Sequence, residues 1–234
     1  MVDANLTLEE QMMARAINNA TKARPRCMPN PWVGAVLVSS DGQMFDGFTQ
    51  EFGGEHAETI CLNEAGRKAQ GATLFVTLEP CSHIGKTGPC VERIIESGIS
   101  RVVIGMKDPD SHVDGEGIKS LQNAGIDVVV GVLETLVSDQ LAPYVHHRKT
   151  GRPYVVLKIA TTLDGRVAAP DGSSQWITGP EARREGHKLR AYSDAICVGK
   201  GTVISDNPQL TVRDWMPDDG ILQNLDPRRV VLGK

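Results

Sequence analysis

Segments patterned as helices alternate with segments patterned as strands over the first 150 residues, and this alternation constrains the fold more than any other feature. Thr7 and Glu10 form a predicted capping box for a helix that ends near residue 24. Asp41 and Gly42 predict a hairpin turn between two strands. Such alternation is typical of a layered α/β domain. We therefore expect strands at 32–39, 45–49, 74–77, 101–105 and 127–132, and helices at 57–69, 91–97 and 117–124.

A second domain is predicted after a break at residues 149–153, where glycine and proline interrupt the pattern. We assign 1–150 to the first domain and 151–234 to the second. Thr178 and Glu181 predict a capping box for a helix over 180–192. The strands expected in this domain are 154–160, which should be buried, 195–198 and 230–232.

The composition restricts the partners of the chain. It contains 40% hydrophobic and 23% charged residues with a net charge of −4, which excludes a disordered chain and provides no polycation for nucleic acid. Aromatic residues, at 4%, are too few for a platform that stacks single-stranded bases. No apolar stretch approaches the ~20 residues that cross a bilayer, and the first residues lack a signal-peptide pattern. We therefore expect a cytoplasmic protein with a small-molecule partner, no nucleic acid and no membrane.

Five cysteines, an odd number, favour metal binding or reduced thiols over a disulfide framework. Three of them, Cys27, Cys61 and Cys197, are expected to be ordinary thiols, and the last two are expected to lie on apolar faces. The other two take part in the strongest chemical signal of the chain, which is described next.

His56-Ala57-Glu58, followed by Cys81 and Cys90, has the elements of a zinc deaminase site. One imidazole and two thiolates make three ligands and leave the fourth tetrahedral position for water, which is typical of catalytic zinc. Glu58 would then carry the proton of that water. Residues two apart on a helix point in nearly opposite directions, so His56 and Glu58 must lie at the first turn of their helix. The alternative is a surface histidine with two core thiols.

Eight residues separate Cys81 from Cys90, against two in the generic deaminase pattern, so a nucleic-acid editor is a poorer match. Two other functions stay open. One is a deaminase of tRNA or of free cytidine or adenosine. The other is a non-catalytic zinc-stabilised binding module, in which Glu58 would be idle.

Several stretches resemble the bifunctional riboflavin-biosynthesis deaminase/reductase family, called RibD or RibG in bacteria. They are PNPWVG at 29–34, His56-Ala57-Glu58, the run from Thr77 through His83 to Cys90, and Asp108-Pro109. The resemblance implies an α/β, cytidine-deaminase-like three-layer domain in which His56, Cys81 and Cys90 bind one zinc ion and Glu58 is the catalytic proton carrier. It also implies the substrate, a diaminopyrimidinone with a ribosylamino phosphate, which is deaminated to the aminouracil.

The chain departs from the family pattern in two places. Gly88 precedes Pro89 where the family often has two prolines, and Asp110-Ser111 follow Pro109 where the family usually has Asn-Pro. Neither change touches a predicted ligand, so both bear on the substrate loops. For His83, a substrate contact and a solvated loop residue are both open.

The second segment resembles the reductase domain of the same family, which is similar to dihydrofolate reductase and uses NADPH to reduce the ribosyl group. The resemblance implies cofactor contacts at Thr161, Trp176, Thr202 and Asp206, and substrate contacts at Ser174, Arg190, Leu210 and Arg213. The family's reductase domain is far longer than the ~80 residues present here. We therefore expect an incomplete reductase domain with an unpaired sheet edge, for which a homo-oligomer is plausible.

Overall fold

The computed structural model describes residues 6–82, 88–110, 113, 115–174, 176–217, 220 and 225–233. The chain divides into two compact units, Met1–Tyr154 and Val155–Lys234, and each is described by itself. Within the described ranges, none of the helices has both the length and the apolar character needed to cross a membrane.

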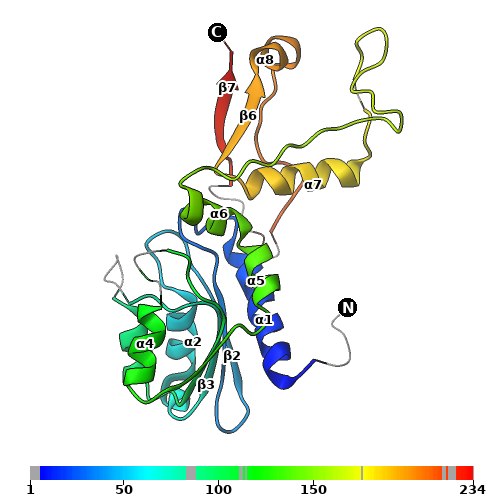
Figure 1. Cartoon of the computed structure of the whole chain (residues 1–234). Helices are drawn as coiled ribbons and strands as arrows, with labels where there is room; N and C mark the ends of the chain where they lie inside the picture. The colour runs from blue at the N-terminus through cyan, green and yellow to red at the C-terminus, as the bar shows by residue number, and fades with distance from the viewer. Residues whose placement is uncertain are drawn as a thin grey trace. The chain divides into compact units, whose positions relative to one another are not determined.

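A five-stranded mixed sheet forms the centre of the first unit (Figure 1). Its order is β2-β1-β3-β4-β5, for β1 (Gly34–Val38), β2 (Met44–Phe48), β3 (Thr73–Leu78), β4 (Arg101–Met106) and β5 (Asp127–Val130). β1 pairs antiparallel with β2 and β3, whereas β3, β4 and β5 run parallel. Because β3 and β4 are parallel, the residues that follow them meet at one edge of the sheet.

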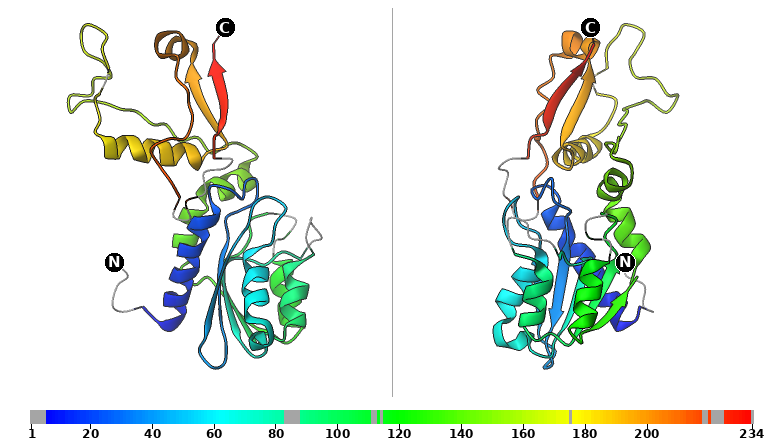
Figure 2. Two further views of the ribbon diagram at one scale, coloured as in Figure 1. Left: turned by 180° about the vertical axis from the view of Figure 1, so that it is seen from behind. Right: turned by 60° about the vertical axis from the view of Figure 1, so that its left-hand side comes forward.

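Helices cover both faces of this sheet (Figures 1 and 2). One face is covered by α1 (Leu8–Ala23) and α5 (Glu134–Gln140), and the other by α2 (Ala57–Ala65), α3 (Cys90–Glu96) and α4 (Glu116–Asn123). The predicted capping box of Thr7 and Glu10 starts α1. Between these layers lies a core of fully buried side chains that includes Met13, Leu37, Leu74, Ile94 and Ile104. The three-layer α/β arrangement predicted for this part of the chain is confirmed.

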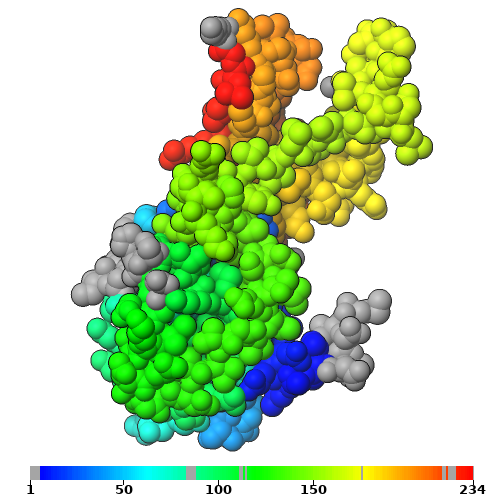
Figure 3. Space-filling view, viewed as in Figure 1, coloured from blue at the N-terminus to red at the C-terminus, as the bar shows by residue number. Residues whose placement is uncertain are grey.

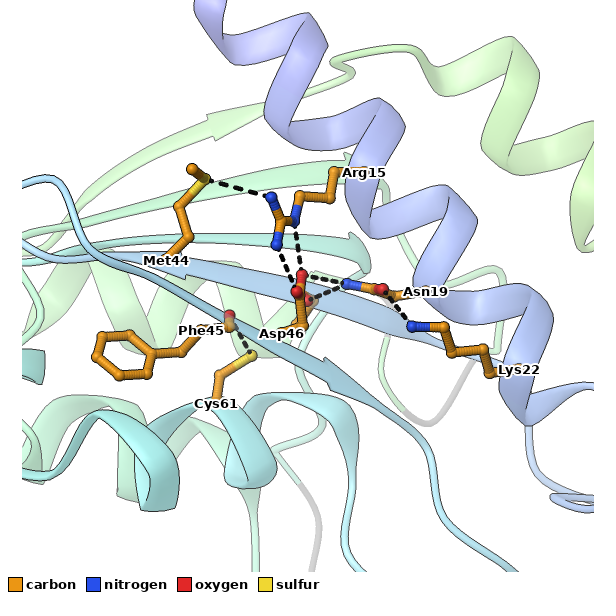
Figure 4. Close-up of polar contacts among 8 residues, drawn as sticks. Arg15, Asn19, Lys22, Met44, Phe45, Asp46 and Cys61 are labelled. Carbon is orange, nitrogen blue, oxygen red and sulfur yellow. Dashed lines mark hydrogen bonds and ion pairs between the residues drawn. The ribbon is translucent and has the colours of Figure 1, made fainter. Parts of the chain in front are cut away.

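Asp46 of the edge strand β2 forms hydrogen bonds with side chains of α1 (Figure 4). The Arg15 guanidinium donates to both carboxylate oxygens, from Nε at 2.8 Å and from Nη2 at 2.6 Å. The side-chain amide of Asn19 donates a third hydrogen bond at 2.7 Å. On the other side of the strand, the thiol of Cys61 in α2 lies 3.4 Å from the Phe45 carbonyl oxygen. β2 is therefore held by polar contacts to both helix layers.

Two expectations for the first unit need correction. The helix predicted over 57–69 ends at Ala65, because Gly66 adopts a φ of 52°, and the chain continues as the short 3-10 helix η1 (Gly66–Ala69). The strand predicted over 127–132 ends at Val130, before Gly131 with a φ of 95°. Two helices that were not predicted, α5 and α6 (Ala142–Thr150), complete the unit.

The second unit contains a parallel pair of strands, β6 (Ala195–Gly199) and β7 (Arg228–Leu232), together with α7 (Pro180–Ala191) and α8 (Lys200–Asp206). Both strands and α7 confirm predicted elements. Residues 162–174 form an irregular loop that projects away from β6 and β7 (Figure 3).

The buried strand predicted at 154–160 is wrong. Val155 and Leu157 of this run are 82% and 80% exposed, and the run has no strand structure. In the described part of this unit β6 and β7 pair only with each other, so the run joins neither strand. An apolar run becomes a strand only where a neighbouring strand can accept its hydrogen bonds.

The capping box predicted at Thr178 is also wrong. Gly179 is the N-cap of α7 and makes no side-chain cap hydrogen bond. Pro180 follows as the first helical residue, where its fixed φ suits a helix and its missing N–H costs nothing. Cys197, expected on an apolar face, is exposed in β6, whereas Cys61 is buried as expected.

Candidate metal site and pocket

Two helix N-termini and the end of one strand bring the predicted metal ligands together. His56 is the N-cap residue of α2, Cys90 begins α3, and Cys81 follows three residues after β3 ends. The Sγ atoms of Cys90 and Cys81 lie 3.3 Å and 3.6 Å from Nδ1 of His56. All three ligand atoms lie within 4.8 Å of one another. The sequence predicted this set, and the fold assembles it.

Hydrogen bonds couple the three ligand side chains, and they shift the pKa values of these groups in opposite directions. The thiol of Cys90 hydrogen-bonds to Cys81 and lowers the pKa of Cys81, whose Sγ also accepts the Cys90 backbone N–H at 3.4 Å. The same contact raises the pKa of Cys90, and the hydrogen bond with Cys81 raises that of His56 to about 8. One sulfur is thus favoured as a thiolate, the form that binds metal. A donor set of one imidazole and two sulfurs fits zinc.

Glu58 lies in the first turn of α2, two residues after His56. The His56 backbone is extended, with φ −79° and ψ 162°, so the usual helical offset between the two side chains does not apply. Both residues line the same pocket, as the sequence led us to expect. Glu58 is only 4% exposed, and this burial raises the pKa of its carboxyl.

Two of the three ligands, His56 and Cys81, line a pocket of about 150 Å³. Part of its wall comes from the segment after β4 and from α6. Asp108 accepts hydrogen bonds from the Tyr144 hydroxyl at 3.0 Å and from the Asp110 backbone N–H at 2.9 Å. Nη1 of Arg148 lies 3.3 Å from the Asp110 carboxylate and forms an ion pair with it. The guanidinium carbon of Arg148 lies 5.1 Å from the centre of the Tyr144 ring and stacks over it. Asn30, Thr49 and Glu79 also line the pocket.

Glu79, which follows β3, forms hydrogen bonds with the segment that follows β4. Its buried carboxylate accepts backbone N–H groups of Asp108, Gly115 and Ile118, each at 3.2 Å. Gly117 lies beside it, where a Cβ atom would be 2.2 Å from the Pro80 carbonyl oxygen. The N-terminus of α4 is therefore packed directly against the residues that precede Cys81.

Three pocket residues, Glu79, Tyr144 and Arg148, were not predicted from the sequence. Glu79 stands in the motif that carries Cys81, but its role depends on backbone N–H groups far along the chain. Tyr144 and Arg148 are four residues apart, the spacing that places side chains on one face of a helix. That signal could be used only if α6 had been predicted. His83 lies outside the described residues.

The structure brings together some of the residues predicted for the reductase region. The Arg190 guanidinium donates to the Thr211 carbonyl oxygen at 3.0 Å, between Leu210 and Arg213, and the Arg213 backbone N–H donates to His187 Nδ1 at 2.9 Å. The remaining predicted positions are exposed, and no contact found among the described residues joins them to this group: Thr161, Ser174, Trp176, Thr202 and Asp206.

Two family descriptions match the chain. The family described as "Cytidine and deoxycytidylate deaminase zinc-binding region" matches residues 6–106, and the "RibD C-terminal domain" matches residues 153–234. Among solved structures, a diaminohydroxyphosphoribosylaminopyrimidine deaminase/5-amino-6-(5-phosphoribosylamino)uracil reductase from Thermotoga maritima is similar, with a TM-score of 0.87 and 45% identity. That similarity covers 97% of this chain and 63% of the Thermotoga chain.

Curated relatives agree with this similarity. The riboflavin biosynthesis protein RibD of Escherichia coli K12 is 45% identical over 221 residues, which is 94% of this chain and 60% of the relative. RibD of Chlamydia pneumoniae is 44% identical over 226 residues, which is 96% of this chain and 59% of that relative. The chain thus spans about 60% of the length of these relatives. With this identity over nearly all of its residues, the chain belongs to the RibD family.

Proposed function

We propose that this chain catalyses the hydrolytic deamination of a diaminopyrimidinone that carries a phosphoribosylamino group, a step of riboflavin biosynthesis. The observation that carries this proposal is the convergence of His56, Cys81 and Cys90 within 4.8 Å, beside a pocket that is lined by His56, Cys81 and the buried Glu58. The name of the Thermotoga relative, a deaminase of this substrate class, supports it. We assign the activity to residues 1–150.

The chemistry follows from the groups in the pocket. When bound by the three ligands, zinc supplies a Lewis acid that lowers the pKa of water toward neutrality. The Glu58 carboxylate takes one proton from the attacking water and donates it to the pyrimidine ring nitrogen. The same group then carries the second proton to the amine, which leaves as ammonia while the ring carbon keeps the oxygen as a carbonyl. Because Glu58 is almost fully buried, bulk water does not compete for these protons.

Polar groups on the pocket wall suit a pyrimidine. The carboxylate of Asp108 and the amide of Asn30 both line the pocket and provide hydrogen-bond groups for ring nitrogens and exocyclic substituents. Asp108 is held in place by the Tyr144 hydroxyl and by the Asp110 backbone N–H. An orienting group that is itself held by hydrogen bonds loses little entropy when the substrate binds.

For residues 151–234 we propose part of an NADPH-dependent reductase domain, supported by the match to the RibD C-terminal domain. In this proposal Thr161, Trp176, Thr202 and Asp206 contact NADPH. Arg190 and Arg213, which the structure brings near Thr211, would bind the sugar phosphate together with Ser174 and Leu210.

The experiment is to measure zinc content and ammonia release with the phosphorylated diaminopyrimidinone, cytidine and adenosine as separate substrates. Turnover of the pyrimidinone by a protein with one zinc ion per chain is the expected result. Preferential turnover of cytidine or adenosine would favour a nucleoside deaminase instead. Bound zinc without turnover of any of the three would overturn the proposal in favour of a zinc-stabilised binding module.

A further inference from the structure

We propose that Arg148 is a specificity-determining residue that binds the phosphate group of the substrate, with Asp110 and Tyr144 as the residues that position its guanidinium. This inference rests on the proposed function, because it concerns the anionic end of the same substrate. Arg148 lies on α6, a helix that was not predicted from the sequence.

The charge of the pocket is the first argument. Four carboxyl groups line it, those of Glu58, Glu79, Asp108 and Asp110. Among the described lining residues Arg148 is the only lysine or arginine. A phosphate group near this wall would be repelled by the carboxylates unless a cation lay close by. Arg148 is placed to offset that repulsion and so favours a ligand with an anionic end.

The geometry of Arg148 is the second argument. Its Nη1 atom lies 3.3 Å from the Asp110 carboxylate, and its guanidinium stacks on the Tyr144 ring. Tyr144 is itself fixed by its hydrogen bond to Asp108, and Asp110 by its backbone N–H to the same carboxylate. The guanidinium is therefore held on one edge and on one face. Its five N–H donors in a rigid fork allow a second, bidentate contact with a phosphate.

The third argument is that the Arg148 side chain is more exposed than that of Asp110, its ion-pair partner. The Asp110 side chain is 16% exposed, whereas that of Arg148 is 38% exposed. The cation is thus the more accessible partner, and the anion lies deeper. This arrangement leaves the guanidinium within reach of a ligand that enters from solvent.

An ion pair between α6 and the segment after β4 can also be purely structural, and the two roles have different consequences. Loss of a structural pair disturbs the whole pocket and impairs every substrate. Loss of a phosphate contact impairs only substrates that carry the phosphate. Comparison of a phosphorylated substrate with its dephosphorylated form separates these cases.

The test uses the variants Arg148→Ala and Arg148→Lys, with Lys149→Ala as the control. Lys149 is the next residue of α6, is exposed and is absent from the pocket wall. Its replacement by alanine therefore removes one positive charge outside the pocket. Steady-state deamination is measured with the phosphorylated diaminopyrimidinone and with the same compound after phosphatase treatment. Thermal denaturation of each variant verifies that it is folded.

For Arg148→Ala we expect KM for the phosphorylated substrate to rise about tenfold or more, as for a lost charge-assisted hydrogen bond, with kcat within about twofold of wild type. KM for the dephosphorylated compound should stay unchanged. Arg148→Lys should be intermediate, and Lys149→Ala should match wild type. Equal changes in KM for both compounds, or no change in either, would overturn the inference.

Failure of the proposed function is visible separately, as absence of turnover by the wild-type protein. In that case binding of ribose 5-phosphate, measured by calorimetry with Arg190→Ala and Arg213→Ala added to every protein to remove the other proposed sugar-phosphate site, tests Arg148 directly. Binding by wild type and Lys149→Ala, together with at least roughly tenfold weaker binding by Arg148→Ala, supports the inference. Equal binding by all three proteins, or no binding by wild type, overturns it.

Discussion

Gly47 of β2 lies so close to Ala57, the first residue of α2, that a Cβ atom at position 47 would be 2.1 Å from the Ala57 carbonyl oxygen. The same atom would be 2.7 Å from Sγ of Cys61. Both distances are far below van der Waals contact, so a side chain at position 47 forces the helix away from the sheet. α2 carries His56 at its N-cap and Glu58 in its first turn. The glycine at position 47 lets α2 pack closely on β2, and this packing places both residues in the candidate site.

Gly47→Ala should therefore weaken both the fold and the metal site. Overpacking of this kind typically costs about 1–3 kcal/mol of the free energy of unfolding, and the displaced His56 should lower zinc affinity. Urea denaturation and zinc content at a fixed free-zinc concentration measure the two effects. Gly88→Ala is the control, because a Cβ atom at that position meets nothing within 4 Å among the residues that the structure describes. Full zinc content and unchanged stability in Gly47→Ala would contradict the argument.

Much of the first domain could be predicted because its signals are local. The capping box of Thr7 and Glu10 depends on residues three apart, and the Asp41-Gly42 turn joins neighbouring strands. The metal ligands could also be predicted, because His56-Ala57-Glu58, Cys81 and Cys90 follow one another in the order of a zinc deaminase signature.

The rest depends on long-range contacts that no local pattern contains. The pocket wall joins Asp108 to Tyr144, 36 positions along the chain, and Glu79 to Ile118, 39 positions along. The apolar run at 154–160 carries the pattern of a strand, but whether it forms one depends on a partner strand elsewhere. The role of Gly47 likewise becomes evident only when α2 is packed against β2.

Replacement of either sulfur ligand should remove most of the zinc. Cys81→Ser and Cys90→Ser each exchange a soft thiolate for a weakly acidic hydroxyl, which is a poor zinc ligand at neutral pH. Zinc per chain, measured by atomic emission after dialysis, should fall well below one. Cys197→Ser is the control, since Cys197 is exposed in β6 and should keep wild-type zinc content. Retention of the metal in both Cys81→Ser and Cys90→Ser would refute the ligand set.

Glu58→Gln should keep zinc and lose deamination. Glutamine can hydrogen-bond to water but cannot carry its proton, and general acid–base catalysis is typically worth ~10²–10⁴ in rate. We expect kcat to decrease by a factor in that range, while the zinc content stays at the wild-type level. Glu64→Gln, on the exposed side of the same helix, should leave kcat unchanged. Activity of Glu58→Gln within about threefold of wild type would exclude Glu58 as the proton carrier.

Tyr144→Phe should weaken substrate binding while preserving the stacking of Arg148. The change removes the hydroxyl that donates to Asp108 at 3.0 Å but keeps the ring beneath the guanidinium. A net hydrogen bond is worth about 1 kcal/mol, so KM should rise by about fivefold for phosphorylated and dephosphorylated substrate alike. The equal effect distinguishes this variant from Arg148→Ala. An unchanged KM for both would show that Asp108 is positioned without the Tyr144 hydroxyl.

The Arg15–Asp46 pair should make stability depend on pH. The hydrogen bonds from Arg15 lower the pKa of Asp46 in the folded protein relative to ~3.9 in the unfolded chain. A carboxyl with a depressed folded pKa stabilises the fold above its unfolded pKa, and this contribution is lost as the pH falls through the folded pKa. Because the Arg15 and Asp46 side chains are 42% and 35% exposed, solvent screening limits it to about 0.5–1 kcal/mol.

Asp46→Asn should accordingly be less stable than wild type by about this amount at pH 7, and the difference should shrink below about pH 4. Urea denaturation of both proteins across this range, with Trp176 and Trp215 replaced by Phe so that the fluorescence reports the buried Trp32, measures the difference for the first unit. Asp139→Asn, an exposed aspartate of α5, is the control and should show little difference at any pH. A stability loss in Asp46→Asn that stays constant from neutral to acidic pH would mean that the change acts through shape alone, since protonation removes the charge of Asp46 and leaves its packing in place.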